Sequence, residues 1–210
     1  MRLLELFAGT GSIGRAFHDR GWEVVSLDLD PQSAPTIVAD ILAWDYTAFP
    51  SGHFDMVWAS PVCTMYSIAR TTAKTPRDLE WADSLVARTL EIIDYYKPRF
   101  WAFENPASGL LKGRPIVAGL PFKDCCYCRY NYKYRKWTRI WGNLAWVPRM
   151  CDKNTPCEDK ARLGVHTMTA QRGPGRGRDG LKAGDVCSLG QLYSMPPQLC
   201  DDIAVAASTL

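Results

Sequence analysis

Short apolar runs alternate with amphipathic stretches along the first half of the chain. A helix is expected over 12–20, where Gly21 supplies a stop signal. A longer helix is expected over 76–96, where apolar residues recur every three or four positions. Strands are expected where the apolar runs are short, at residues 3–7, 23–27, 36–39, 54–59 and 100–103. This alternation predicts parallel strands joined by crossover helices, which is an α/β doubly wound sheet.

The second half of the chain has a different pattern. Residues 125–134 and 139–146 are interpreted as two further strands, which would give the mostly parallel sheet an antiparallel end. Residues 194–207 predict a closing helix with proline in its first turn. Between them, residues 147–188 are rich in Cys, Gly and Arg and lack apolar periodicity. We therefore expect a single domain over 1–210 that contains an irregular insertion at 147–188.

Composition narrows the class of protein. The 210 residues suffice for one sizeable core, and the formal net charge of +3 permits a polyanionic partner without requiring one. No apolar run approaches the roughly 20 residues of a membrane span, and the N-terminus has no apolar signal segment. The eight cysteines are then expected to be thiols or metal ligands rather than disulfides. These features predict an intracellular protein, cytoplasmic or nuclear, without a membrane partner.

A glycine-rich loop, Gly9-x-Gly11-x-x-Gly14, joins the first expected strand to the first helix. Asp28 follows about 20 residues later, at the end of the second strand. This arrangement predicts a dinucleotide or adenosyl site, in which glycines let the backbone approach the ligand and the acid binds ribose hydroxyls. The ammonium of S-adenosylmethionine needs acceptors nearby. Acidic residues at successive strand ends favour that ligand, and they are Glu5, Asp28, Asp30 and Asp40.

A cysteine and a glutamate follow two neighbouring strands. Cys63 lies in the loop after residues 54–59, and Glu104 directly follows residues 100–103. Because adjacent parallel strands end at the same edge of a sheet, these two loops are expected to lie close together. Cys63 is then either a nucleophile or a small apolar residue that fills space. The glutamate could donate to a ring nitrogen if burial keeps it protonated.

Seven motifs occur in the order found in the DNA cytosine-5 methyltransferases. The chain resembles most closely the short, virus-type members, over residues 1–146 and 190–205. The motifs are LLELFAGTGSIGRAF, SLDLDP, VADIL, ASPVCTMYS, FENPASGLL, YRKWTRIWGN and YSMPPQL. The resemblance implies a class I methyltransferase fold that binds S-adenosylmethionine. It also implies methylation of cytosine carbon-5 in DNA, through a covalent Cys63 adduct at carbon-6 of a flipped-out base.

The resemblance also implies roles for individual residues. Cys63 matches the catalytic cysteine, Glu104 and Asn105 match the acidic motif after the fifth strand, and Arg139 matches an arginine that helps to hold the target base. Asp28 would bind the ribose, and Asp40 and Ile41 would contact the adenine. The rest of the expected cofactor site comprises Phe7, Ala8, Gly9, Gly11, Ser12, Ser60 and Ser194.

Several departures from the family pattern bear on function. Val62 stands where the family has proline before the cysteine, and the Gln-x-Arg-x-Arg strand is recast as Tyr134-Arg-Lys-Trp-Thr-Arg139. Only residues 147–188 are available in place of a target-recognition region, so DNA specificity is expected to be low or encoded in loops. Candidate loops are 64–77, with Arg70, Lys74 and Arg77, and 172–178. Two alternatives remain: a weak or inactive protein that binds nucleic acid and S-adenosylmethionine, or a methyltransferase for RNA or free pyrimidine nucleotides.

Cysteines of the second half offer a metal site. Three thiolates and an imidazole suffice for a closed tetrahedral zinc site. The set that we choose is Cys128, Cys151, Cys157 and His166, although Cys125 or Cys126 could replace Cys128. Such a clip would keep a region with little core folded. Free thiols are the other interpretation, and the oligomeric state is not indicated by the sequence.

Overall fold

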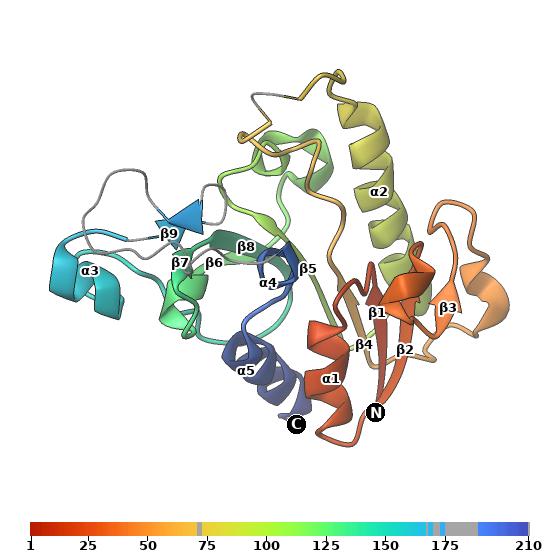
Figure 1. Cartoon of the computed structure of the whole chain (residues 1–210). Coiled ribbons are helices and arrows are strands. Elements are labelled where there is room, and N and C mark those ends of the chain that lie inside the picture. Colours follow the sequence, from red (N-terminus) through yellow and green to blue (C-terminus); the bar gives the residue numbers. More distant parts are fainter. Residues whose placement is uncertain (71–72, 167, 170–172, 175–188, 210) are drawn as a thin grey trace.

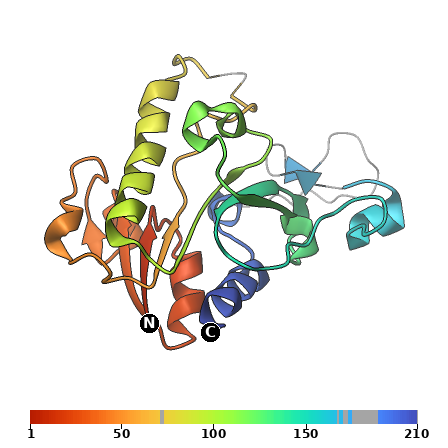
Figure 2. The same ribbon diagram turned by 180° about the vertical axis from the view of Figure 1, so that it is seen from behind.

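The computed structural model describes residues 1–70, 73–166, 168–169, 173–174 and 189–209. Its centre is a seven-stranded sheet with the order β3-β2-β1-β4-β5-β8-β6. Helices α1 (Ser12–His18) and α5 (Pro197–Ser208) cover one face, and α2 (Leu79–Tyr96) covers the other (Figures 1 and 2). The strands are β1 (Arg2–Leu6), β2 (Glu23–Asp28), β3 (Ile37–Val38), β4 (Met56–Ala59), β5 (Phe100–Pro106), β6 (Phe122–Cys126) and β8 (Trp137–Gly142).

Alternating side chains of the central strands fill two apolar layers. Leu3, Met56 and Ala102 pack with α1 and α5, whereas their neighbours in sequence pack with α2. The first five strands are parallel, as the sequence predicts. Short 3-10 helices complete the connections and comprise η1 (Pro31–Ser33), η2 (Tyr46–Ala48), η3 (Leu111–Gly113), η4 (Pro115–Val117) and η5 (Tyr127–Arg129). The mostly parallel α/β fold is therefore confirmed.

The antiparallel end of the sheet is present, but its strands differ from the expected ranges. β8 runs antiparallel to β5 on one side and to β6 on the other. Residues 127–133, expected to be strand, instead form η5 and a turn in which Asn131 has a positive φ of 65°, and Tyr134 begins the short strand β7. The physical reason lies in Tyr127, Tyr130 and Tyr134, which are all buried in the layer beneath α1 and α5. Tyr127 and Tyr130 are three residues apart, so a regular strand would place them on opposite faces and could not bury both in this layer.

A small lobe stands beside the main sheet (Figure 1). It contains a second sheet of β7 (Tyr134–Arg135), β9 (Met168–Thr169) and β10 (Gly173–Pro174), together with α3 (Glu158–Leu163). Part of the expected insertion belongs to this lobe. The remainder, including most of the candidate loop 172–178, lies outside the described residues. α4 (Leu189–Tyr193) then leads to α5, and none of the helices described is long and apolar enough to span a membrane.

Candidate active site

A cleft of about 1130 Å³ opens at the carboxyl ends of β1, β2, β4 and β5. Pockets for single small ligands commonly measure about 300–1,000 Å³, so this cleft has room for more than one such ligand. Most of the residues predicted from the sequence line it. They are Phe7, Ala8, Gly9, Ser12, Asp28, Asp40, Ile41, Ser60, Cys63 and Glu104. Gly11, Asn105, Arg139 and Ser194 are not among the lining residues.

The glycine loop bends sharply between β1 and α1. Phe7, Gly9 and Gly11 have positive φ angles of 55°, 49° and 63°, and Gly11 is the residue that precedes α1. The Gly9 N–H donates to Asp28 Oδ2 at 2.8 Å, which ties the loop to the end of β2. The loop and the acid therefore form one wall of the cleft, as the motif predicts.

Beneath this loop lies Glu5, a carboxylate that is only 4% exposed. It accepts hydrogen bonds from the backbone N–H groups of Ile13 and Gly14, and a Cβ at Gly14 would collide with it. Burial raises the pKa of Glu5 to about 7, because the charged form is poorly solvated there. Glu5 thus lines the cleft as a carboxyl group that titrates near neutrality.

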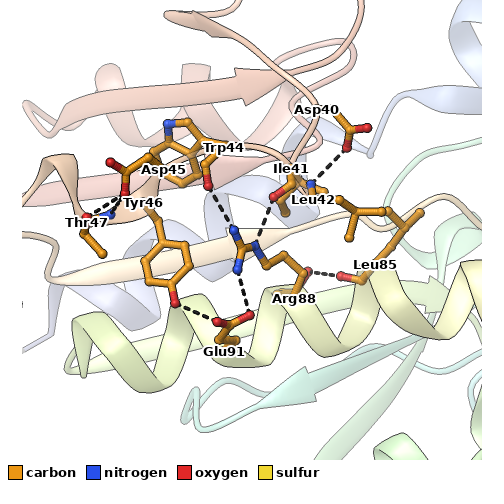
Figure 3. A network of polar contacts seen from close by, with 11 residues as sticks. Asp40, Ile41, Leu42, Trp44, Asp45, Tyr46, Thr47, Leu85, Arg88 and Glu91 are labelled. Atoms are coloured by element: carbon orange, nitrogen blue, oxygen red, sulfur yellow. Dashed lines mark hydrogen bonds and ion pairs between the residues drawn. The ribbon is translucent and has the colours of Figure 1, made fainter.

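The far end of the cleft is held by an arginine on α2 (Figure 3). The Arg88 guanidinium donates to the backbone carbonyls of Ile41 at 3.1 Å and Trp44 at 3.0 Å, and it pairs with Glu91 at 2.9 Å. Asp40 Oδ1 accepts from the Leu42 N–H at 2.9 Å, which closes the turn at the start of this segment. The loop after β3 is therefore fixed by α2.

Cys63 lies in the loop after β4, is half-buried and lines the cleft. Burial raises the pKa of its thiol, and the Glu104 charge raises it further, whereas Lys136 lowers it. Cys63, Glu104 and Lys136 all line the cleft, which therefore holds a thiol, a carboxylate and an ammonium. The convergence of Cys63 and Glu104 follows from β4 and β5 being adjacent parallel strands.

The Cys63 loop is held by side chains that do not line the cleft. Asn105 Nδ2, in the buried strand β5, donates to the Pro61 carbonyl at 2.9 Å. Tyr66 donates to Asp83 of α2 at 2.8 Å, and Arg114 pairs with the same carboxylate. The loop therefore rests on both β5 and α2, which limits the positions that Cys63 can take.

Glu104 is buried near the end of β5, with 7% of its surface exposed. Thr138 Oγ1 donates to its Oε1 at 3.2 Å, and Lys136 Nζ lies 3.3 Å from the same oxygen. Lys136 also lines the cleft. The carboxylate therefore faces the open cleft with a cation and a hydroxyl beside it.

The structure does not bring Arg139 to the cleft, contrary to the prediction from the sequence. Arg139 is directly opposite Asn105 in the β5–β8 register, whereas Glu104 is opposite Ile140. Since neighbouring residues of a strand point to opposite faces, Arg139 lies on the other face of the sheet from Glu104. Its guanidinium pairs there with Asp124 at 2.7 Å and stacks over Phe122.

Sequence reasoning thus missed Lys136 and Thr138. A signal for both was present, because Tyr134-x-Lys136-x-Thr138 has the alternation of the Gln-x-Arg-x-Arg strand and Arg139 is out of phase with it. Choosing between Lys136 and Arg139 as the residue that faces the cleft required the strand register, which the sequence did not provide.

The closing motif reaches the glycine loop through the backbone. The Met195 N–H donates to Ser12 Oγ at 3.3 Å, and Met195 lines the cleft. Ser194 instead hydrogen-bonds the Tyr132 hydroxyl at 2.7 Å. Ser194 therefore fastens the motif to the second half of the chain.

The candidate loop 64–77 uses its arginines internally. Arg70 donates to the Thr75 carbonyl at 2.8 Å, and Arg77 donates to the Ser67 carbonyl at 2.8 Å. These arginines therefore stabilise the loop backbone. Lys74 is exposed, and residues 71 and 72 lie outside the described part of the chain.

The four predicted metal ligands come together in the lobe. The ligand atoms of Cys128, Cys151, Cys157 and His166 all lie within 4.8 Å of one another. His166 Nε2 is 3.6 Å from Cys128 Sγ and 3.2 Å from Cys151 Sγ. Burial lowers the pKa of His166, which favours the neutral ring that can offer a lone pair to a metal. The arrangement is that of a closed Cys3His site.

Comparison with known proteins gives one family and several related folds. The profile of the family described as C-5 cytosine-specific DNA methylase matches residues 1–114. A probable DNA (cytosine-5)-methyltransferase of Frog virus 3 (isolate Goorha) is 35% identical over 199 residues, which cover 86% of this chain and 90% of that protein.

Two solved structures have a similar fold at 14% identity. One is a putative DNA modification methyltransferase encoded within a prophage of E. coli, with a TM-score of 0.51 over 86% of this chain. The other is the S. pombe Dnmt2 methyltransferase, with a TM-score of 0.50 over 89%. The matches span 57% and 58% of those two chains, so both are considerably longer.

Proposed function

Because this chain belongs to the C-5 cytosine-specific DNA methylases, we propose that it transfers a methyl group from S-adenosylmethionine to carbon-5 of cytosine in DNA. The observation that carries the proposal is that Cys63, Glu104 and the glycine loop all line one cleft. This reaction requires a nucleophile, an acid and a cofactor-binding surface within one cavity.

The cleft fits the cofactor. The backbone of Phe7, Ala8 and Gly9 is open to a ligand, and Ser12 stands at the start of α1 on the same wall. Asp28 would hold the ribose, Asp40 and Ile41 the adenine, and Ser60 would complete the wall beside β4. Gly11 and Ser194 would act by shaping the loop and the closing motif. When bound, S-adenosylmethionine supplies an electrophilic methyl group.

Cys63 and Glu104 would prepare the cytosine. The Cys63 thiolate attacks carbon-6 and breaks the aromaticity of the ring. A proton on Glu104, donated to ring nitrogen 3, stabilises the resulting enamine, and carbon-5 gains the electron density that it lacks in free cytosine. Carbon-5 would then bond to the methyl group. Loss of the carbon-5 proton to solvent, return of the nitrogen-3 proton to Glu104 and cleavage of the carbon-6–sulfur bond would restore the ring and release the Cys63 thiolate. Asn105 would act by holding the Pro61 carbonyl and hence the cysteine loop.

DNA is the proposed substrate, with the target base flipped out of the duplex into the cleft. The volume of the cleft supports this step, since it exceeds what one ligand needs. We further propose that the chain is a single domain. In it, the insertion at 147–188 takes the place of a target-recognition region, which leaves sequence specificity low or encoded in loops.

Replacing the nucleophile tests the reaction. Cys63→Ala is expected to abolish methylation while affinity for S-adenosylmethionine stays within about twofold, because the sulfur is needed for covalent catalysis and not for cofactor binding. The measurement is formation of a covalent adduct with DNA that contains 5-fluorocytosine, together with enzymatic or bisulfite sequencing of methylated DNA. Cys200→Ala is the matched control, since that buried thiol lies in α5 away from the cleft.

Other outcomes of the same assay distinguish the alternative functions. Normal methylation by the Cys63→Ala variant would refute the assignment of the nucleophile. Adducts with RNA or free nucleotides but not with DNA would identify a different substrate. Cofactor binding without any adduct would indicate a protein that binds S-adenosylmethionine without catalysis.

We also propose that Cys128, Cys151, Cys157 and His166 bind a structural zinc ion. A tetrahedron with ligands about 2.3 Å from the metal has edges of about 3.8 Å, which resembles the 3.2 Å and 3.6 Å distances to His166. Four ligands leave no position for water, so the ion would stabilise the lobe and take no part in catalysis. One zinc ion per chain is expected by elemental analysis, and none in the Cys151→Ser/Cys157→Ser double variant.

A further inference from the structure

Lys136 is a charged residue of the cleft to which the sequence assigned no role. Its Nζ lies 3.3 Å from Glu104 Oε1 and 3.4 Å from the Tyr127 hydroxyl, and it stands 4.7 Å from the centroid of the Tyr127 ring. The side chains of Lys136 and Glu104 are only 16% and 9% exposed. Salt and water therefore screen this ion pair much less than a surface pair.

The same ammonium acts on Cys63. The charged side chains that influence this thiol are Glu104, which raises its pKa, and Lys136, which lowers it. Lys136 thus pairs with the Glu104 carboxylate and lines the same cleft as the Cys63 thiol, and both of those groups can carry a negative charge. Arg139, which the sequence suggested as the cation of the site, is paired with Asp124 on the opposite face of the sheet.

We propose that Lys136 is the shared counter-ion of Glu104 and Cys63, so that the pair carries one negative charge throughout the reaction. The charge resides on Glu104 before the base enters and on the Cys63 sulfur during attack. The Cys63 S–H gives up its proton, and the Glu104 carboxylate takes it up. The charge of the three groups does not change. The second state is the one that the proposed cytosine methylation needs, because it contains both the thiolate and the acid.

The remaining titratable groups near the pair come from four elements. Burial raises the pKa of Cys125 on β6 and of Tyr127 on η5, so both stay neutral between pH 6 and 9. Arg135 on β7 is a cation throughout this range. Glu5 on β1 lines the same cleft and titrates at about pH 7, so variants must be compared with the unaltered protein at each pH. Lys136 is therefore the residue to alter.

The counter-ion role predicts a shift of the whole pH profile. At low pH both Cys63 and Glu104 are protonated, at high pH neither is, and the active form has one proton between them. The rate should therefore rise and fall with pH. Lys136→Met removes the cation that favours loss of each proton, so both limbs should move to higher pH, by about one unit or more. Lys136→Arg keeps the charge and should keep the limbs within about 0.3 units.

The experiment measures DNA methylation rate against pH for the unaltered protein and for the Met and Arg variants. Lys112→Met is the matched control, because Lys112 is exposed, stands 5.9 Å from the centroid of the Trp137 ring and does not itself line the cleft. Should the Met variant fail to fold, Lys136→Gln removes the charge while keeping a polar side chain. A rate that falls equally at every pH, with both limbs unmoved, overturns the proposal.

A second readout does not require methylation. Alkylation of Cys63 by iodoacetamide, followed on its own peptide by mass spectrometry, reports the thiolate fraction at each pH. The alkylation midpoint should rise in the Met variant and stay in place in the Arg variant. An unmoved midpoint in the Met variant overturns the counter-ion role. If the midpoint moves but no variant or unaltered protein methylates DNA, the counter-ion role stands and the proposed function fails.

Discussion

Two buried carboxylates of the cleft differ in their surroundings. Glu104 faces an ammonium and a threonine hydroxyl, whereas Glu5 faces backbone N–H groups of α1. Burial dominates at Glu5 and raises its pKa to about 7. Both residues are glutamates, so their different surroundings come from the partners that the fold places beside each of them.

The raised pKa of Glu5 makes folding stability depend on pH. Between its unfolded value of 4.5 and about 7, the folded chain binds the extra proton, so this contribution to stability falls as pH rises. Glu5→Gln mimics the protonated form, so this variant should not lose that contribution to stability as pH rises. We expect the difference in unfolding free energy between variant and unaltered protein to grow by about 2–3 kcal/mol from pH 5 to pH 8. Urea unfolding at each pH measures it.

Glu23→Gln is the control for this comparison, because Glu23 lies at the surface in an exposed pair with Arg2. Its difference from the unaltered protein should change little over the same range. A difference for Glu5→Gln that is constant with pH would contradict a Glu5 pKa near 7.

At the scale of elements, α2 supports two walls of the cleft. Arg88 holds the carbonyls of Ile41 and Trp44 in the loop after β3. One and a half turns earlier, Asp83 holds Tyr66 and Arg114, and with them the loop that carries Cys63. A single helix thus fixes the expected adenine end and the nucleophile loop relative to each other.

Removing the first of these supports should loosen the expected adenine end. Arg88→Ala deletes two charge-assisted hydrogen bonds to buried carbonyls, each worth about 1.5–3 kcal/mol. We expect roughly 2–3 kcal/mol less stability and roughly tenfold weaker binding of S-adenosylmethionine. Thermal unfolding and calorimetric titration measure these effects. Glu91→Gln is the control, because it keeps the carbonyl contacts of Arg88 and should affect cofactor binding by less than about twofold. If both variants weakened the binding of S-adenosylmethionine equally, the role given to Arg88 would be contradicted.

At the scale of the molecule, the chain segment that contains β7 and Lys136 connects the lobe to the cleft. β7 pairs with β9 in the lobe, and His166 lies two residues before β9. Lys136 follows β7 directly and leads into β8 of the main sheet. A metal ion that stabilised the lobe would therefore also help to position Lys136, which lies beside Glu104.

Metal removal should then separate cofactor binding from catalysis. Chelation of the proposed zinc is expected to speed proteolysis within residues 150–166 and to lower methylation at least about tenfold, because the lobe has little apolar core of its own. Affinity for S-adenosylmethionine should change by less than about twofold, since the glycine loop belongs to the main sheet. Limited proteolysis and calorimetry measure these effects. An equal loss of methylation and of S-adenosylmethionine binding would contradict this expectation. Restoration of methylation by magnesium instead of zinc would also contradict it.

The sequence by itself determined the features that depend on local pattern and chain order. Apolar periodicity defines the parallel half of the sheet and α2, because a buried face must repeat with the period of its element. Chain order brings Cys63 and Glu104 to one edge, because adjacent parallel strands end on the same side. Local pattern and chain order likewise predict the glycine loop and the position of Asp28 beside it.

Only the tertiary structure decided which cation meets Glu104 and how residues 127–134 fold. The phase of β8 is fixed by its register with β5, and a shift of one residue would exchange the faces of Lys136 and Arg139. The tyrosines of 127–134 follow the layer beneath α1 and α5, which is built by distant parts of the chain. The four side chains that the sequence predicted as metal ligands, spread over residues 128–166, meet for the same reason. Contacts between distant residues carry no local signature, because their free energy exists only once the chain is folded.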